Sequence, residues 1–393
     1  MNRVLAARFA LPLVGFLVFA TALGVNLQMP LYVSYAEAGG YGTSAIAAVF
    51  AFYALTLVAF LLSLGGLSDA IGRKPAMIGA GVSALAATLL VQIWPTLEAV
   101  AVARVLQGLA VGLATSAGTA YAAELAGAPD AAKSAARTIT ATVSAGFGVR
   151  ALATALALLV TPAATPITYW LHMILATSAI ALAAILPETR APNAGTWMRL
   201  PLFPKGTVAL AAAIIPAWTV TGILIAVVPS VMAANGLSGF NWAALSLFLI
   251  NLVGVAFQSL SARLSPRRSV LLGLILLNLG MVGISAGAVA GSAPILVLGA
   301  IVAGSAAYGF IFTGGLTAVS VAAGAERARA AAGFFLFAYI GFSVPPLLTG
   351  LVFGLLGATA TLAAATVSIA LASCLIAAVS LVPGGSNSSA DKT

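Results

Sequence analysis

Long apolar segments separated by short polar gaps run through the whole chain. Each segment is close to the roughly 20 apolar residues that a helix needs to cross the hydrocarbon core of a bilayer. Lipid offers the backbone no hydrogen-bond partner, so we expect every segment to be a helix and none a strand. The pattern predicts an all-α membrane protein with twelve transmembrane helices, near 11–33, 44–64, 76–94, 98–122, 136–160, 167–187, 207–231, 241–261, 269–290, 294–320, 332–356 and 358–382.

The longest polar stretch between predicted spans divides the chain into two halves of six helices. It is rich in Pro, Asn and Gly, which are poor helix formers. We therefore expect an N-terminal six-helix bundle over 1–187 and a cytoplasmic linker over 188–206. A C-terminal six-helix bundle with a short cytoplasmic tail would occupy 207–393. Two pseudo-symmetric halves of equal size are typical of duplicated transporter folds.

Lys and Arg are confined to alternate gaps of this pattern. Of the 17 in the chain, all but Arg104 and Arg150 lie in gaps that would face one side of the membrane, or near the termini. Cytoplasmic loops carry the excess of Lys and Arg in membrane proteins. We therefore expect both termini to be cytoplasmic and the chain to be a multi-pass protein of the cell's inner membrane.

Composition excludes several classes of function. Hydrophobic residues make up 62% of the chain and charged residues 6%, whereas soluble proteins carry about 25% charged residues, so a water-soluble enzyme is excluded. The net charge of +9 reflects topology rather than nucleic-acid binding, because the basic residues lie in the gaps. A single Cys and a single His leave little material for a metal site or a hydrolytic site. We expect no cofactor, and a membrane-embedded enzyme is only a distant alternative.

The gap between the second and third spans reads GGLSDAIGRK over 65–74. It resembles the G-x-L-x-D-x-x-G-R-K loop of the major facilitator superfamily in length, spacing and position. The resemblance implies a gating loop in which Gly65 and Gly72 permit tight turns, while Asp69 and Arg73 latch helices together. The alternative is a loop that only sets topology, with Asp69 as a helix cap. The corresponding gap of the second half, 261–268, looks like a worn copy without an Asp.

Three further stretches resemble the same superfamily, in particular its twelve-helix drug:proton antiporters. They are Leu23-Gly24 ahead of Pro30 in span one, RVLQG over 104–108 in span four, and PETR over 187–190 after span six. The glycine- and proline-rich element that such antiporters carry in span five is replaced here by a segment that contains Arg150. The resemblance implies a monomeric secondary transporter that works by alternating access and exports its substrate against protons. An uptake symporter or an exchanger for an organic anion is the alternative.

Two arginines, Arg104 in span four and Arg150 in span five, are predicted to lie inside the membrane. A charged side chain at that depth costs about 3 kcal/mol or more, so it needs a partner or a water-filled cavity. No acid lies in the middle of a predicted span, and Asn26 stands where related exporters often carry one. Two fixed positive charges without a carboxylate favour anions. Both arginines are therefore candidate substrate-binding residues for a small anionic or zwitterionic compound, with packing against backbone carbonyls as the alternative.

Polar and aromatic side chains in other spans are further candidates for lining the cavity, although each could serve only packing or anchoring at the interface. These candidates are Asn26, Gln28, Tyr53 and Gln107 in the first half, and Trp218, Asn251, Tyr308 and Tyr339 in the second. Glu124, near the inner end of span four, is the candidate proton-coupling residue. The predicted partners are thus a small-molecule substrate, a proton and the lipid bilayer. The chain contains no nucleotide-binding loop, so we do not expect ATP hydrolysis to drive transport.

Overall fold

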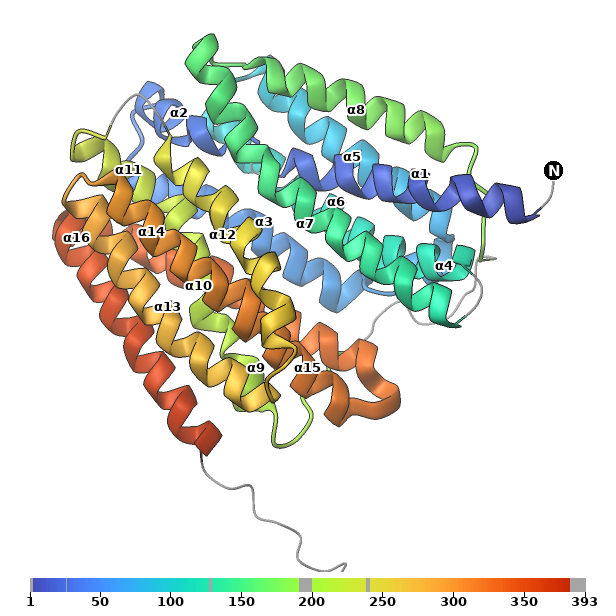
Figure 1. The fold of residues 1–393 in the computed structure, drawn as a ribbon. Helices are drawn as coiled ribbons and strands as arrows, with labels where there is room; N and C mark the ends of the chain where they lie inside the picture. The colour runs from blue at the N-terminus through green and yellow to red at the C-terminus, as the bar shows by residue number, and fades with distance from the viewer. Residues whose placement is uncertain (1–2, 26, 127–128, 191–199, 238–240, 382–393) are drawn as a thin grey trace, which may run out of the picture.

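The computed structural model describes residues 3–25, 27–126, 129–190, 200–237 and 241–381, and the regular structure in these ranges is helical (Figure 1). Asn26, a predicted site residue, lies outside them. The helices in chain order are α1 Arg3–Gly24, η1 Met29–Leu31, α2 Tyr32–Ala38, α3 Thr43–Leu64, α4 Leu67–Ile71, α5 Arg73–Ile93, α6 Leu97–Ala126, α7 Pro129–Val160, α8 Ile167–Ala183, α9 Val208–Ala212, α10 Ile214–Ala226, α11 Val228–Ala234, α12 Trp242–Ser261, α13 Pro266–Val289, α14 Ala293–Gly304, η2 Ser305–Ile311, α15 Phe312–Ala323, η3 Gly324–Glu326 and α16 Arg327–Leu381.

The lengths of these helices fit a multi-pass membrane protein. Among the described residues, nine helices are long and apolar enough to cross a membrane, and two shorter apolar helices lie over Gly146–Val160 and Ile167–Ala183. One of the nine, α16, has 55 residues, which is about 82 Å of helix against a hydrocarbon core of about 30 Å. It is interrupted at Gly357, where φ is 75° and ψ is 176°, so we divide it there into a first and a second arm. Counted in this way, the structure is consistent with the twelve predicted spans, and the all-α membrane fold is confirmed.

The two halves of the chain form two groups of helices that lie side by side, with α1 to α8 in one and α9 to α16 in the other (Figure 1). Within each group, small residues let helices approach closely, as is usual where lipid provides no hydrophobic drive for association. Between α13 and α14, for example, a Cβ built on Gly283 would lie 2.8 Å from the Cα of Gly299. A side chain at either position would force these two helices apart.

Three predicted spans are not continuous α-helices. The first stops at Gly24 and resumes as η1 and α2, because Pro30 lacks an N–H and its ring excludes a preceding helical turn. The seventh is divided into α9, α10 and α11, with Val227 at a φ of −120° between the last two. The tenth contains the π-helical segment η2, which carries Tyr308. π-helical insertions are frequent at functional sites. The hydrophobic pattern reveals none of these three interruptions.

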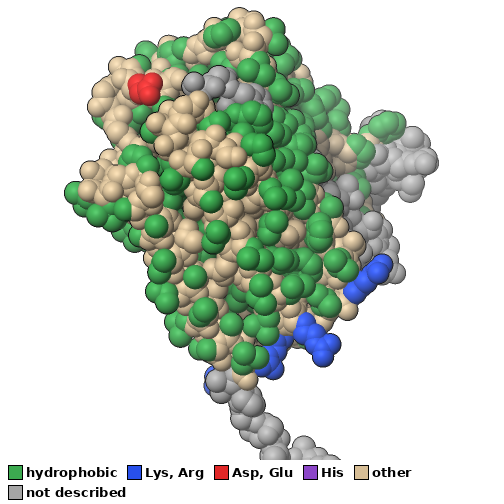
Figure 2. Space-filling view, turned by 60° about the vertical axis from the view of Figure 1, so that its left-hand side comes forward, with side chains coloured by type: hydrophobic (Ala, Val, Ile, Leu, Met, Phe, Trp, Pro, Cys, Tyr) green, Lys and Arg blue, Asp and Glu red, His purple; other side chains and the backbone are tan. Residues whose placement is uncertain are grey.

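Side chains on the outside of the two groups are largely apolar, as contact with lipid requires. Figure 2 shows hydrophobic side chains over most of the visible face, with Lys and Arg gathered at one end and an acidic side chain at the other. Several large apolar residues are strongly exposed, including Val160 at 85% and Leu355 at 84%. We call the end that carries Arg73, Arg190 and Arg329 the basic end, and the opposite end, which carries the Gly357 turn, the far end.

The two halves are in contact at the far end. Asn241 Nδ2 donates a hydrogen bond to the Pro30 carbonyl across the halves at 3.3 Å. Nearby, α3 and the first arm of α16 pack so closely that a Cβ on Gly350 would lie 2.2 Å from the Cβ of Ala47. One hydrophobic cluster contains buried residues of both halves, and a second lies within the first half. The structure therefore has its far end closed by direct backbone-to-side-chain contact between the halves.

Candidate functional site

Arg104 on α6 is completely buried, with 0% of its surface exposed, and it is bonded within the first half. Its Nη1 donates to Gln107 Oε1 at 3.1 Å, and its Nη2 donates to the Phe50 carbonyl at 3.2 Å. The guanidinium also lies over two rings, with its Cζ 5.1 Å from the centroid of Phe50 and 4.6 Å from that of Tyr53. Residues three apart on a helix are neighbours, so the R-x-x-Q spacing places Gln107 beside the guanidinium. Arg104 thus ties α6 to α3.

Gln107 extends this contact to the end of the first helix. Its Nε2 donates to the Gly24 carbonyl at 3.0 Å and lies 3.4 Å from Gln28 Oε1. Gly24 is the last residue of α1, where the chain leaves the helix and its carbonyls lack helical partners. The structure therefore brings together three predicted site residues, Gln28, Arg104 and Gln107, in one hydrogen-bonded group at the break in the first span.

Arg150 on α7 is also buried, with 5% of its surface exposed, but its hydrogen-bonding is incomplete. Its Cζ lies 4.5 Å from the ring centroid of Phe147, one helical turn earlier. Among the described residues, no group accepts a hydrogen bond from its Nε or its Nη1. It lies within electrostatic range of Arg104, Tyr53 and Tyr308, and no acidic side chain in the described part of the chain acts on it at that range. Arg150 is therefore a buried cation between the two halves, with two donor groups that no described residue accepts from.

An aromatic cluster from the second half faces these arginines. The ring of Trp218 on α10 lies 6.1 Å from Tyr308, 5.2 Å from Tyr339 and 5.6 Å from Phe342, measured between centroids. Phe342 in turn lies 4.8 Å from Phe50 of the first half. Within the described part of the chain, Trp218 Nε1 is buried without a hydrogen-bond acceptor. We call the group formed by Tyr53, Arg150, Trp218, Tyr308, Tyr339 and Phe342 the central cluster.

Three aromatic residues of this region were not among the predicted candidates. Phe50 and Phe147 pack on the two guanidinium groups, and Phe342 joins the two halves. A signal for Phe342 is present in the sequence, because Phe335, Tyr339 and Phe342 recur at helical spacing on one face of a span. For Phe50 and Phe147 the sequence gives no such signal, because a phenylalanine in an apolar segment has the same pattern whether it lines a site or packs in the core.

Asn251 on α12 lies at a different contact between the halves. Its Nδ2 donates to the Leu247 carbonyl at 2.8 Å, one turn earlier in its own helix. A Cβ built on Gly148 of α7 would lie 3.7 Å from the Asn251 Cβ, which is ordinary packing distance. The amide is thus satisfied within its helix, and its neighbour on α7 is two residues from Arg150.

The gating loop depends on glycine at position 72. Gly72 has a φ of +100°, which only glycine adopts readily, and a Cβ there would lie 2.6 Å from Glu188 Oε2. The Glu188 carboxylate accepts hydrogen bonds from the backbone N–H groups of Arg73 at 2.9 Å and Lys74 at 3.1 Å. These are unpaired amides at the start of α5, where a carboxylate is also favoured by the helix dipole. Glu188 of the PETR stretch therefore caps the N-terminus of α5, and Gly72 leaves the space that its carboxylate needs.

Arg73 is the centre of an ion-pair network at the basic end. Its Nη2 lies 2.7 Å from Asp69 Oδ1 and 2.8 Å from Glu124 Oε1, and its Nε lies 3.1 Å from the same Glu124 oxygen. Thr189 donates to Glu124 Oε2 at 2.6 Å, and Arg190 Nε lies 3.4 Å from Asp69. The network joins α4, α5, α6 and the segment after α8, all in the first half. Glu124, the predicted coupling residue, is thus a partner of Arg73 rather than of either buried arginine.

The other glycine of the loop, Gly65, ends α3. A Cβ there would lie 2.6 Å from the Leu61 carbonyl of the helix.

In the corresponding gap of the second half, hydroxyl groups replace the ion pairs. Ser261 and Ser269 lie 2.6 Å apart, and Ser269 Oγ donates to the Phe310 carbonyl at 2.8 Å. The second gap therefore joins its helices without charge, in agreement with its loss of the Asp.

Two bundles of membrane-spanning helices around a buried, positively charged cluster define a transporter rather than an enzyme. The chain belongs to the Major Facilitator Superfamily, whose sequence profile matches residues 14–344. No curated protein sequence matches the chain.

Solved structures share the fold at low sequence identity. The nucleoside transporter NupG matches with a TM-score of 0.70 and 15% identity, over 95% of this chain and 98% of that one. A D-xylose–proton symporter matches with a TM-score of 0.69 and 15% identity, over 95% and 97% of the two chains. The human organic anion transporter MFSD10 matches with a TM-score of 0.56 and 18% identity, over 94% and 99%. The predicted family is confirmed, and these matches support transport as the function.

Proposed function

We propose that the protein is a secondary transporter that exports a small organic anion or zwitterion by alternating access, with Arg150 as the residue that binds the negative charge. The observation that supports this most directly is that Nε and Nη1 of the buried Arg150 guanidinium have no acceptor among the described residues. Unpaired donors and an unpaired charge are costly inside a protein. An anion at the central cluster would supply both the missing acceptors and the missing charge.

The electrostatics of the site favour an anion over a cation. Arg104 and Arg150 are close enough to repel each other. Among the acids whose side chains the structure describes, Asp69, Glu124, Glu188 and Glu326 lie at the basic end, and Glu37 and Glu98 lie at the far end. A cation would add a third positive charge in a region of low dielectric, whereas a carboxylate would reduce the repulsion. Because Arg104 already donates to Gln107 and Phe50, we assign it to positioning and Arg150 to binding.

The aromatic members of the central cluster would hold the uncharged part of the substrate. Trp218 and Tyr308 present ring faces, and Trp218 Nε1 is one more donor that lacks an acceptor in the described part of the chain. Similar folds are known for proteins named as transporters of nucleosides, of organic anions and of D-xylose with protons. An anionic cargo is therefore compatible with this fold.

For coupling, we propose that a proton acts on Glu124. Protonation would remove one of the two carboxylates that hold Arg73 and so loosen the network at the basic end. With the basic end in the cytoplasm and the protein monomeric in the cell's inner membrane, proton entry from outside would accompany export. An anion exchanger is the second candidate, because no described carboxylate lies near Arg104 or Arg150. Exchange needs no proton carrier in the middle of the membrane.

Counterflow in proteoliposomes tests the substrate class. Radiolabelled benzoate, phenylalanine and tetraphenylphosphonium would represent anions, zwitterions and cations. We expect benzoate or phenylalanine to exchange, and Arg150→Gln to reduce that rate at least tenfold, while Arg268→Gln, an exposed arginine at the basic end, leaves it unchanged. Exchange of tetraphenylphosphonium alone, or full activity of Arg150→Gln, would contradict the proposal. An imposed pH gradient distinguishes export by antiport from anion exchange, which responds only to anions on the opposite side.

A further inference from the structure

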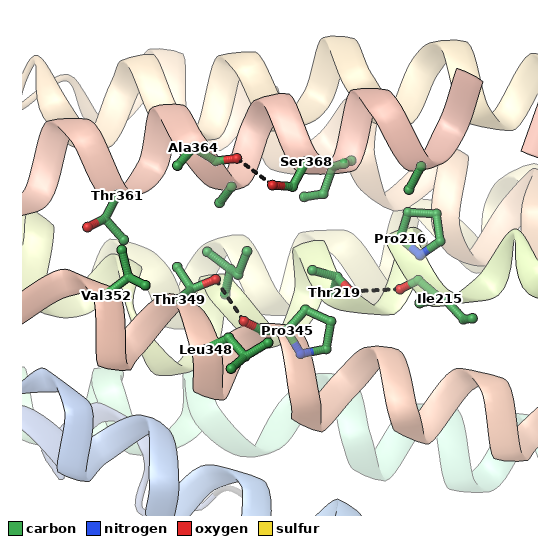
Figure 3. Close-up of a pocket in the computed structure, with 14 residues that line it drawn as sticks. Ile215, Pro216, Thr219, Pro345, Leu348, Thr349, Val352, Thr361, Ala364 and Ser368 are labelled. Carbon is green, nitrogen blue, oxygen red and sulfur yellow. Dashed lines mark hydrogen bonds between the residues drawn. The ribbon is translucent and has the colours of Figure 1, made fainter. Parts of the chain in front are cut away.

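A cavity lies in the C-terminal half, lined by residues outside the central cluster. It has a volume of about 300 Å³ and is enclosed by α10 and the two arms of α16. Figure 3 shows side chains of the two arms facing each other across it, with Thr361, Ala364 and Ser368 on the second arm and Leu348, Thr349 and Val352 on the first. We call it the arm groove.

The walls of the arm groove are apolar apart from four hydroxyl groups. Three of these bond within their own helix: Thr219 to the Ile215 carbonyl, Thr349 to that of Pro345, and Ser368 to that of Ala364, each at 2.8 Å. A hydroxyl that bonds to the carbonyl four residues earlier is satisfied and presents mainly its carbon atoms outward. The groove is therefore a hydrocarbon-like surface over most of its length.

The fourth hydroxyl, that of Thr361, is the exception. The residue is 1% exposed and, among the described residues, its Oγ1 has no hydrogen-bond partner. The physical reason is the turn between the two arms. The residue four positions earlier is Gly357, whose φ of 75° and ψ of 176° take its carbonyl out of the helical pattern. Judged by the described residues, the groove thus has one unsatisfied polar group, and it lies at the far end.

The arm groove opens to the outside of the bundle. Ala364 and Ser368 on its rim are exposed, and Leu348 is 55% exposed. In a membrane-spanning chain such a surface faces the hydrocarbon core. Apolar cavities of about 150 Å³ stay free of water and bind apolar molecules, and an empty void loses dispersion contacts along its lining. A cavity of this size that faces hydrocarbon is therefore filled by hydrocarbon.

We propose that the arm groove binds one acyl chain of a membrane phospholipid, with the ester carbonyl at Thr361. The polar group lies at the end of the groove nearest the Gly357 turn, where the bundle ends and the ester region of a bilayer begins. The stretch from Thr361 to Ala372, both lining residues, is about 16 Å long at 1.5 Å per residue. That length runs through roughly half of a hydrocarbon core of about 30 Å, so an acyl chain of one leaflet matches it.

The site touches helices that also carry the central cluster. Thr219 of the groove follows Trp218 on α10, and Pro345 of the groove lies one turn after Phe342 on the first arm. A chain seated in the groove would therefore pack against the backs of the segments that must move when the two halves rearrange.

Native mass spectrometry of protein reconstituted in vesicles of palmitoyl-oleoyl phosphatidylglycerol and phosphatidylethanolamine, then extracted in mild detergent, tests this site. The informative pair is Ala364→Phe and Ala363→Phe. Both alanines are exposed in the same helical turn, but only Ala364 lines the groove. We expect the wild-type protein and Ala363→Phe to retain one tightly bound phospholipid, and Ala364→Phe to lose at least threefold in the bound fraction. Thr361→Val, which keeps the shape and removes the hydroxyl, should lower it about twofold.

Several results would overturn the proposal. Equal retention by Ala364→Phe and the wild-type protein would show that no lipid occupies the groove, and equal loss in both Phe variants would show a general effect at the lipid surface. A retained molecule whose mass is not that of a phospholipid would show another occupant, such as a lipophilic substrate. Full retention by Thr361→Val would refute the placement of the ester. Monodisperse elution of each variant establishes that it is folded.

Discussion

Arg104 and Arg150, the two buried arginines within the spans, differ in a way that predicts opposite effects on stability. Within the ranges that the structure describes, Arg150 has two donors without acceptors and one ring contact, with Phe147. Replacing it with Met removes a buried charge that costs about 3 kcal/mol and loses a cation–π contact of about 1 kcal/mol. We therefore expect Arg150→Met to stabilise the protein by about 2 kcal/mol. Arg150→Lys, which keeps the charge, should bring no such gain.

Arg104→Met should have the reverse effect. It removes two hydrogen bonds to neutral oxygens from a charged donor, of about 2 kcal/mol each. It also removes contacts with the rings of Phe50 and Tyr53, of about 1 kcal/mol each. These losses exceed the relief of about 3 kcal/mol from removing the charge, so the variant should be less stable by about 3 kcal/mol.

Thermal unfolding of the purified variants in detergent measures the difference. A change of 1 kcal/mol corresponds to about 2–4 °C in apparent Tm, so the two Met variants should lie on opposite sides of the wild-type protein. Arg150→Met should nevertheless lose anion counterflow. If Arg150→Met melts as far below the wild-type protein as Arg104→Met, then Arg150 has structural partners and its assignment to substrate binding is wrong.

Three further outcomes follow from contacts at the two ends of the bundle. Gly72→Ala should lower the apparent Tm by several degrees and reduce counterflow, since its Cβ would displace the carboxylate that caps α5. Gly206→Ala is the control, because Gly206 has a φ of +79° but no atom within 4 Å of a Cβ, so this variant measures the backbone strain alone. Glu124→Gln should transport at a rate that no longer responds to a pH gradient, because an amide cannot take up the proton; a preserved response in flux assays would place coupling elsewhere. Gly350→Val should prevent closure of the far end and lower counterflow at least fivefold. Gly354→Val, with open space around its Cβ, should behave like the wild-type protein. Equal activity in the two variants would show that the contact at Gly350 is not part of the transport cycle.

Properties of short segments, read from the sequence alone, were sufficient to predict the architecture. The spans follow from the length of each apolar segment, because only a helix satisfies its backbone in lipid. The family follows from short motifs such as 65–74, whose glycine and charge positions are local requirements of one turn and one helix start. The alternation of Lys and Arg among the gaps likewise predicted which gaps lie at the same end of the bundle, and the basic end of the structure agrees with this prediction.

The roles of particular side chains depended on the tertiary structure. In sequence, both arginines lie within apolar segments, but Arg104 belongs to the RVLQG motif with Gln107 three residues on, whereas Arg150 belongs to no such motif. The fold decides the rest of the difference, because it brings the Phe50 carbonyl to Arg104 and leaves Arg150 beside rings and another cation. The π-helical segment at Tyr308 and the Thr361 hydroxyl, which has no partner among the described residues, likewise depend on the fold. Hydrophobicity is summed along a segment and is readable from sequence, whereas hydrogen-bond satisfaction depends on which distant atoms packing brings within about 3 Å.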